Sequence, residues 1–477
     1  MGVFETIGAF IMTAFYAVFD VLWGDFITIP LPGGSSLGIS LLILILIPSG
    51  IYFTIRTRFL PFRLFPEMVR VTVEKKEPSH KDAISGLQTL FVSTATRVGM
   101  GNLVGVVAAI SIGGAGAIFW MWLIALLSSS TAFIEATLAQ LYKEKDPLYG
   151  GYRGGPAYYI HHLFVKKGSA RKRSVLAVLF ALSGLICWCG ISQVIGNSVS
   201  SAFENAFHIP PLYTTIVLVA FAAVIVLRKN ATVKVLDVMV PIMAVCYFVI
   251  TLFIIFKNAG QIPAVFQRIF SEAFGFRQAA AGGIGAVIMN GAKRGLFSNE
   301  AGSGSAPCAA AAADISHPAK EGLIQALGVF IDTIVICSCS AMIMLLAPSS
   351  LTNGLEGMDF LQTAMQHHLG DFGVIFIAAI LWLFSFSTFI GILFYARSNV
   401  AYLFGDNWLS QTLYKILALI MLFIGGLAAY TFVWDLGDFG VGLMTVFNMI
   451  ALFPLAPKAL DSLKDYERMR KQTSEKL

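Results

Sequence analysis

The chain has 477 residues, of which 57% are hydrophobic and only 13% are charged. About a quarter of the residues of an ordinary soluble protein are charged, so this composition excludes that class. The net charge of +6 is modest, which argues against a nucleic-acid-binding protein. The six cysteines show no CxxC pair and no zinc spacing, so we predict neither a structural metal nor a redox motif.

The first apolar segment, Val3 to Trp23, has no basic start and no small-residue cleavage site, so it does not resemble a signal peptide. Glu5 and Asp20 interrupt it, and we expect a helix lying at the membrane interface. Runs able to cross about 30 Å of hydrocarbon then recur along the chain. They predict an all-α polytopic membrane protein with eleven transmembrane helices, near residues 38–55, 84–111, 116–141, 174–199, 212–228, 235–256, 280–304, 321–347, 373–396, 411–431 and 436–454.

The distribution of basic residues predicts how the chain is oriented in the membrane. With the N-terminus outside, nearly all Lys and Arg fall in loops assigned to the cytoplasm, including the cluster Arg171-Lys172-Arg173 and the C-terminal tail. The outside loops carry only Lys257, Arg268 and Arg277. Because cytoplasmic loops of membrane proteins are enriched in Lys and Arg, we predict the N-terminus outside and the C-terminus in the cytoplasm of a plasma-membrane protein.

Two parts of the chain resemble each other at one constant offset. Arg97 and Asn102 recur as Arg294 and Asn299, and Glu135 is matched by Asp332. Five predicted spans follow each start, so the second unit would enter the membrane from the opposite side, as in transporters built from inverted repeats. A chance match of two Gly/Ala-rich helices is the alternative. The predicted organisation is a leading segment 1–83, a first five-helix repeat 84–256, a second 257–457 and a basic tail 458–477.

The first helix of each repeat carries residues that weaken a helix. Span two contains TATRVGMGNLVG, and span seven contains GAKRGLFSNEAGSGSAP. Gly and Asn favour unwinding there, and unpaired backbone in a bilayer persists only where it lines a cavity. Free carbonyls suit Na⁺ and free amides suit a carboxylate, so an interrupted helix could bind an amino acid zwitterion. Close helix packing through Gly101 and Gly105 is the structural alternative.

Charged residues inside predicted spans need partners. Arg97 and Glu135 have the same separation as Arg294 and Asp332. We expect these charges to pair within each repeat or across the repeat interface, where they would brace the interrupted helices or form gates. Snorkelling at helix ends is the alternative, chiefly for Lys293. Glu300 could instead be a proton site. No nucleophile–base or metal-ligand signature points to an enzyme.

Several stretches of the sequence resemble those of a known protein family. The stretches KRGLFSNEAGSGSAP (293–307) and HPAKEGLIQALGVFIDT (317–333) are similar to the signature of the alanine/glycine:cation symporters, also called sodium:alanine symporters. VGMGNLVGV, GGAGAIFWMW, GGYRGGPAYYI and FSFSTFIG also match, and together the matches cover residues from about 85 to 400. The resemblance implies a leucine-transporter-like fold and Na⁺-coupled uptake of small neutral amino acids, with Na⁺ as the coupling ion and no other cofactor.

The resemblance also implies site residues. The family's GTGN stretch, a substrate-binding segment, aligns with Gly99, Met100, Gly101 and Asn102, and the amides near Met100 and Gly101 would hold the substrate carboxylate. Gln193 aligns with a glutamine that contacts substrate, although interhelical bonding is its alternative role. We add Asn290, Gly291 and Phe297 from the second interrupted helix and Ile392 from the eighth core helix. The carbonyls of Ala95 and Val98 and the hydroxyls of Ser387 and Thr388 would bind Na⁺, unless those hydroxyls only bond their own helix.

The sequence departs from the family pattern at several positions. Met100 replaces a usual threonine, Ser303 a usual methionine or leucine, and Ile392 a usual tryptophan. Tyr395-Ala396-Arg397 stands where the family has YGE. Losing a bulky indole would enlarge the pocket, which favours room for a longer neutral amino acid such as glutamine. We therefore expect an Na⁺-coupled carrier of alanine, glycine or glutamine. The alternatives are a proton-coupled carrier, an amino-acid sensor or a channel, and no obligate protein partner is evident.

Overall fold

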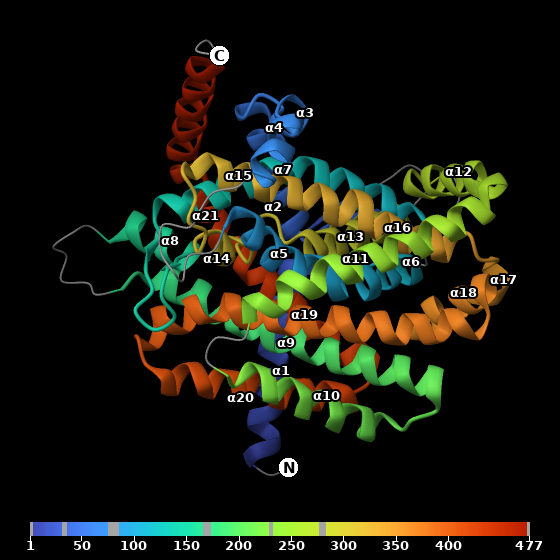
Figure 1. The fold of residues 1–477 in the computed structure, drawn as a ribbon. Helices are drawn as coiled ribbons and strands as arrows, with labels where there is room; N and C mark the ends of the chain where they lie inside the picture. The colour runs from blue at the N-terminus through green and yellow to red at the C-terminus, as the bar shows by residue number, and fades with distance from the viewer. Residues whose placement is uncertain are drawn as a thin grey trace.

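The computed structural model describes residues 3–30, 36–74, 85–165, 173–228, 232–275 and 283–474. These residues are mostly helical (Figure 1). The only strands among them form two short antiparallel pairs, β1 (Ile27–Pro30) with β2 (Ser36–Ile39) and β3 (Glu144–Lys145) with β4 (Tyr152–Arg153).

The helices before residue 275 include the leading segment and the first predicted repeat. In chain order they are α1 (Val3–Trp23), α2 (Leu41–Arg56), α3 (Leu60–Arg63), α4 (Phe65–Thr72), α5 (Gly86–Thr96), the π-helical η1 (Arg97–Gly105), α6 (Val106–Gly113), α7 (Gly116–Leu141), α8 (Pro156–Phe164), α9 (Val175–Phe207), α10 (Pro211–Val226), α11 (Thr232–Lys257), the short 3₁₀ turn η2 (Ala259–Gln261) and α12 (Ile262–Ala273).

The helices after residue 282 include the second predicted repeat and the tail. In chain order they are α13 (Gly283–Asn299), α14 (Pro307–Ala310), α15 (Pro318–Val329), the π-helical η3 (Phe330–Cys337), α16 (Ser338–Leu345), α17 (Ser349–Thr352), α18 (Gly357–Leu369), α19 (Asp371–Phe404), α20 (Trp408–Leu427) and α21 (Tyr430–Ser474).

Among the described residues, eight helices are long and apolar enough to cross a membrane. Two shorter apolar helices, α2 and α10, occupy two further predicted spans. A helix lies over each of the eleven predicted ranges, but α13 is not among the long apolar helices, so the count of eleven stays a prediction. A polytopic helical membrane protein is confirmed at this coarser level.

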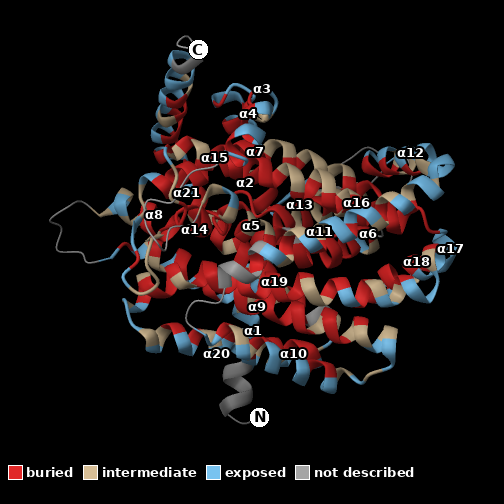
Figure 2. Cartoon of the chain, viewed as in Figure 1, coloured by how far each residue is buried: buried red, intermediate tan, exposed pale blue. Residues whose placement is uncertain are grey.

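The buried residues gather in the middle of the molecule, where α7, α9, α15, α19 and α21 pack together (Figure 2). The helices α10, α11 and α20 instead present rows of exposed Ile, Leu, Val and Phe. Exposed apolar surface of this extent is expected where a protein faces lipid. These three helices therefore form part of the lipid-facing outside, and the central ones position the site.

The predicted interruption of the first helix is wrong in its form. Residues 86–113 run on as one helix, and Arg97 to Gly105 are π-helical rather than unwound. A π-helix widens the turn and shifts the backbone hydrogen-bond pattern, and such turns are frequent at functional sites. Side chains supply part of the missing pairing: the Gly99 N–H donates to Asn102 Oδ1 at 3.1 Å. The glycines thus loosen this helix without opening it.

The predicted interruption of the second helix is confirmed. Helix α13 ends at Asn299, and turns carry the chain to α14 at Pro307. Three residues within this segment adopt positive φ: Glu300 at 57°, Gly302 at 98° and Gly304 at 83°. Such a conformation is readily available to glycine but strained for other residues. The segment from Glu300 to Ala306 is therefore a true break between two helical pieces.

The helix η3 was not anticipated from the sequence. It interrupts the α15–α16 helix with eight π-helical residues and contacts η1 directly. Two widened turns from the two predicted repeats thus meet inside the protein. Their contact brings Asn102 of η1 to Asp332 of η3, which sets the geometry of the site.

Candidate functional site

Three of the four predicted Na⁺ ligands meet at the contact of α5 with α19. The Ala95 carbonyl accepts hydrogen bonds from the Thr388 hydroxyl at 3.2 Å and the Ser387 hydroxyl at 3.4 Å. All three residues are buried. One carbonyl and two hydroxyl oxygens are ligands that a hard cation prefers. Val98, the fourth, lies in η1 beside them, and its role stays a prediction.

The close approach of η1 to α19 depends on Gly99. A Cβ at that position would lie 2.0 Å from Thr388 Oγ1. The next residue, Met100, points its N–H toward the same hydroxyl at 3.4 Å. Its thioether accepts a hydrogen bond from Ser385 at 3.1 Å. Thr388 therefore joins the predicted ion ligands to the amides that the resemblance assigns to the substrate carboxylate.

Asn102 belongs to a hydrogen-bond network that links three helices. Its side-chain amide donates to the Asp332 carboxylate at 2.8 Å and to the Asp332 carbonyl at 3.0 Å. The same carboxylate accepts from Ser298 of α13 at 2.8 Å and from Thr333 at 2.7 Å. Gly101 completes the contact, since a Cβ there would lie 2.9 Å from the Ser298 Cα. This network fixes η1, η3 and α13 relative to one another.

The predicted pairing of Arg294 with Asp332 is wrong. Arg294 instead forms a two-pronged ion pair with Asp438 of α21, at 3.2 and 2.9 Å. Lys293 binds the same carboxylate at 2.8 Å, so it does not snorkel to a helix end. Asp332 has no ion pair among the described residues, because hydroxyl and amide donors surround it. Asp438 lies in a stretch of α21 that no sequence motif marked.

The predicted pairing of Arg97 with Glu135 is also wrong. Arg97 donates to the side chain and carbonyl of Gln325 on α15, at 3.2 and 3.3 Å. Glu135 accepts from the Gly302 N–H at 3.0 Å and from the Asn448 side chain. Its carboxylate therefore holds an unpaired amide of the break. Its partner therefore differs from the one predicted, and a role for Glu135 in bracing the interrupted helix stays a prediction.

The remaining predicted residues fall into two groups. Asn290 and Gly291 face the α6–α7 elbow: a Cβ at Gly291 would meet the Ala117 carbonyl at 2.6 Å. Phe297 packs edge-on against Trp434 of α21, with ring centroids 5.0 Å apart. The buried residues Gln193 and Ile392 lie on α9 and α19. Glu300, at the start of the break, accepts from the Tyr395 hydroxyl at 3.2 Å.

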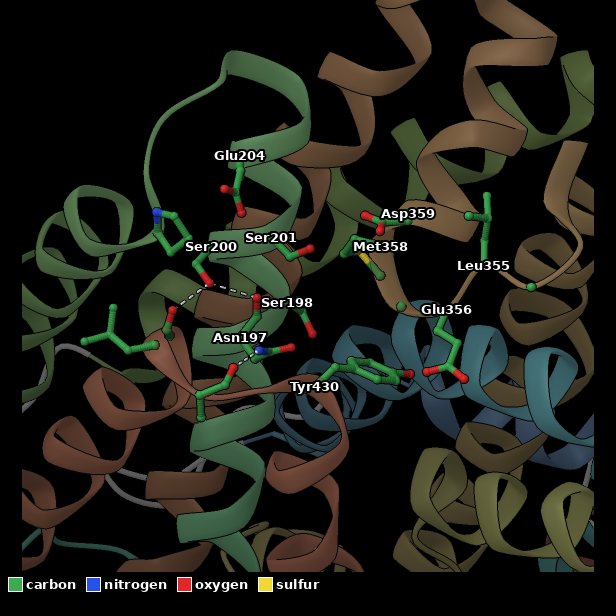
Figure 3. Close-up of a pocket in the computed structure, with 16 residues that line it drawn as sticks. Asn197, Ser198, Ser200, Ser201, Glu204, Leu355, Glu356, Met358, Asp359 and Tyr430 are labelled. Atoms are coloured by element: carbon green, nitrogen blue, oxygen red, sulfur yellow. Dashed lines mark hydrogen bonds between the residues drawn. The ribbon is translucent and has the colours of Figure 1, made fainter.

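A cavity of about 540 Å³ lies between the end of α9, the α17–α18 turn and the α20–α21 turn (Figure 3). Three carboxylates line it: Glu204, Glu356 and Asp359. We call it the vestibule. Tyr430 lies at its edge with its hydroxyl end toward Glu356 (Figure 3). The sequence did not indicate this cavity, because its lining comes from loops far apart in the chain.

Comparisons with known proteins identify the family. The model of the sodium:alanine symporter family matches residues 33–477. A protein named probable sodium/glutamine symporter GlnT of Bacillus subtilis (strain 168) is 43% identical over 433 residues, which cover 90% of this chain and 88% of its own. The sodium/alanine symporter AgcS of Methanococcus maripaludis is 34% identical over 435 residues, covering 90% of this chain and 95% of its own.

Solved structures show the same fold. The crystal structure of MhsT in complex with L-phenylalanine superposes with a TM-score of 0.56 at 12% identity, over 80% of this chain and 89% of that one. A manganese transporter of Eremococcus coleocola gives a TM-score of 0.50 at 13% identity, over 82% of this chain and 81% of its own. The likeness confirms the transporter fold that the resemblance implied. The chain therefore belongs to the sodium:alanine symporter family, whose members are transporters and not enzymes.

Proposed function

We propose that the protein couples the uptake of a small neutral amino acid to the entry of Na⁺. The observation that carries this is the meeting of the Ala95 carbonyl with the Ser387 and Thr388 hydroxyls beside η1. Those oxygens suit Na⁺, and the neighbouring amides of Met100 and Gly101 suit a carboxylate. Alanine and glycine are the expected substrates, and the buried Ile392, smaller than tryptophan, favours room for glutamine.

Coupling would follow from the shared residue Thr388. Its hydroxyl bonds the Ala95 carbonyl and lies at 3.4 Å from the Met100 N–H. An Na⁺ ion that takes the carbonyl and the hydroxyl oxygen would hold η1 in one arrangement. The substrate would then bind an ordered site more tightly, and by linkage it would tighten Na⁺ binding by the same factor.

Alternating access would use the two predicted five-helix units as moving parts. In support, α5–η1–α6, α7, α9, α10 and α11 have counterparts in the same order in α13–α14, α15–η3–α16, α19, α20 and α21. With the N-terminus outside, the vestibule would open to the exterior, and its carboxylates Glu204, Glu356 and Asp359 would attract cations. Eleven spans and an inverted repeat complete this proposal.

The test is uptake of labelled alanine, glycine and glutamine into proteoliposomes, with and without an inward Na⁺ gradient. Uptake that requires Na⁺ and ignores a pH gradient is expected. Uptake that follows a proton gradient alone would replace Na⁺ by H⁺ and direct attention to Glu135 and Glu300. Binding without uptake would indicate a sensor, and currents far above the turnover of a carrier would indicate a channel.

In Ile392→Trp, glutamine uptake is expected to fall relative to alanine uptake. An unchanged ratio of the two uptake rates would contradict the pocket-size argument.

A further inference from the structure

A cavity of about 290 Å³ lies where the end of α2 and the turn after it meet α21. We call it the basic cavity, because four basic side chains and only two carboxylates line it: Arg56, Arg58, Arg63, Lys464, Asp461 and Glu467. Two ion pairs lie within this set, Arg63 with Glu467 at 2.7 Å and Lys464 with Asp461 at 2.9 Å. Arg56 and Arg58 form no ion pair with any described residue. The lining therefore carries two guanidinium charges in excess.

The turn after α2 brings both of these arginines to the basic cavity. Arg58 and Phe59 adopt positive φ, at 57° and 55°, a left-handed conformation that bulky residues rarely take. The Arg63 guanidinium stabilises the turn by donating to the carbonyls of Arg58 and Thr57, each at 3.2 Å. Backbone strain of this kind gathers at functional sites, where the surrounding structure maintains it. The strained turn is thus a second indication that the basic cavity binds a ligand.

An apolar surface leads along α2 and α21 to the basic cavity. Tyr52 precedes Arg56 by one helical turn, and the Arg56 guanidinium lies over its ring at 5.7 Å from the centroid. Phe453 precedes Pro457, which lines the cavity, by one turn of α21. The rings of Tyr52 and Phe453 lie 5.5 Å apart, and both side chains are exposed, as is that of Ile55. Exposed apolar side chains on membrane helices face lipid.

The position of the basic cavity matches the surface of the cytoplasmic leaflet. The distribution of Lys and Arg predicts that the end of α2 and the tail of α21 lie on the cytoplasmic side, and α3, α4 and the end of α21 lie at one end of the molecule (Figure 1). Anionic lipids give that leaflet its negative surface potential, and basic pockets between membrane helices bind their head groups. A soluble anion would use the arginines alone and leave the apolar surface beside them uncovered.

We propose that the basic cavity binds the head group of an anionic phospholipid. The phosphodiester oxygens accept hydrogen bonds from the guanidinium groups of Arg56 and Arg58, which suit phosphate in charge and in donor geometry. The acyl chains lie against Tyr52 and Phe453. The lipid then joins α2, which precedes the first proposed repeat, to α21, the last helix of the second. This binding is independent of the proposed transport function.

The experiment is native mass spectrometry of the full-length protein in detergent, titrated with phosphatidylglycerol or with phosphatidylcholine of the same acyl chains. We expect phosphatidylglycerol, which has a net negative charge, to bind at least about tenfold more tightly than the zwitterionic lipid. Arg58→Gln should weaken phosphatidylglycerol binding about fivefold and change phosphatidylcholine binding little. Arg56→Gln should do the same, and it decides the matter if Arg58→Gln fails to fold.

The matched control is Arg468→Gln. Arg468 is an exposed arginine of α21 that does not line the basic cavity, and it has no ion pair within the part of the chain that the structure describes. Its loss removes the same charge from the same end of the molecule and should leave phosphatidylglycerol binding intact. An equal loss of binding in Arg468→Gln and Arg58→Gln would overturn the proposal, because it would show attraction to the whole basic surface. Equal binding of the two lipids by the wild type would also overturn it.

A competition arm separates a phospholipid from a soluble anion. Inorganic phosphate at millimolar concentration should not displace bound phosphatidylglycerol, because it has no acyl chains to cover Tyr52 and Phe453. Displacement by inorganic phosphate would assign the basic cavity to a soluble anion and would refute the lipid site.

Discussion

At the scale of single residues, Thr388 stands at the centre of the candidate site. Its hydroxyl bonds the Ala95 carbonyl and approaches the Met100 N–H. Gly99 permits this approach, because any Cβ there would overlap the hydroxyl. The residue thus connects the proposed ion ligands with the proposed substrate amides. A change at Thr388 should therefore affect Na⁺ dependence before it affects folding.

We expect Thr388→Val to raise the Na⁺ concentration that gives half-maximal alanine uptake by roughly tenfold, because one oxygen ligand is lost while the side-chain shape is kept. Uptake measured across an Na⁺ series in proteoliposomes checks this. Thr251→Val is the control, because that buried hydroxyl donates to the Tyr247 carbonyl of its own helix α11. If both variants shift the Na⁺ dependence equally, Thr388 is not an ion ligand.

At the scale of elements, the glycine-rich first helices of the two proposed repeats differ in structure. The glycines of η1 widen the turn, and the helix continues. The glycines after α13 take positive φ, and the helix ends. Gly105 and Gly302 occupy matching positions in the two repeats. A Cβ at Gly105 would have open space around it, whereas one at Gly302 would lie 2.7 Å from Met449 Cε. Glycine is therefore required at position 302 but not at position 105.

Gly302→Ala is expected to destabilise the protein by about 1–3 kcal/mol, since alanine at φ 98° is strained and its methyl group crowds Met449. Gly105→Ala should be neutral or slightly stabilising, because alanine favours a helix. Thermal unfolding of the two purified variants in detergent measures the difference. Equal melting temperatures would show that the strained turn at Gly302 is absent.

At the scale of the whole molecule, the end of α21 reaches back to the leading segment. Glu67 of α4 binds Arg70 at 2.6 Å, and it also accepts a hydrogen bond from Tyr466 of α21. Arg470 of α21 lies 3.5 Å from the same carboxylate, and Arg63 binds Glu467 at 2.7 Å. These contacts join the first and last parts of the chain. The contacts that Glu67 makes depend on the negative charge of its carboxylate.

This link should weaken in acid. Burial acts to raise the pKa of Glu67, but the bonds from Arg70 and Tyr466 and the nearby arginines outweigh it and hold the pKa below its ordinary 4.5. A depressed carboxyl pKa stabilises the folded state above the unfolded value and loses that effect as pH falls through the folded value. The contact of α4 with α21 should therefore be intact at neutral pH and loosen below about pH 4.5.

Spin labels at the exposed positions Val73 and Lys471 would report this change. The distance distribution between them should broaden on acidification below pH 4.5. In Glu67→Gln it should already be broad at neutral pH, because the neutral side chain binds Arg70 and Arg470 more weakly. A distribution that is the same at both pH values in the wild type would contradict the proposed link.

Features that depend on local composition could be predicted from the amino-acid sequence. The length of the apolar runs identified a helical membrane protein, since hydrocarbon excludes polar backbone and charge. Gly and Asn marked the perturbed places in spans two and seven, but nothing in the composition marked η3. The resemblance named Ala95, Ser387 and Thr388, and the structure brings these three together. Composition did not distinguish the widened helix η1 from the true break after Asn299.

The partners of the buried charges, in contrast, followed from the packing of helices. Arg294 pairs with Asp438, 144 residues away, and Glu135 receives the amide of Gly302, 167 residues away. Equal spacing in the two repeats suggested other partners, but spacing along the chain does not fix which helix faces lie opposite one another. A buried charge takes whichever partner the packing brings within reach, because leaving it unpaired costs more than any local preference can offset.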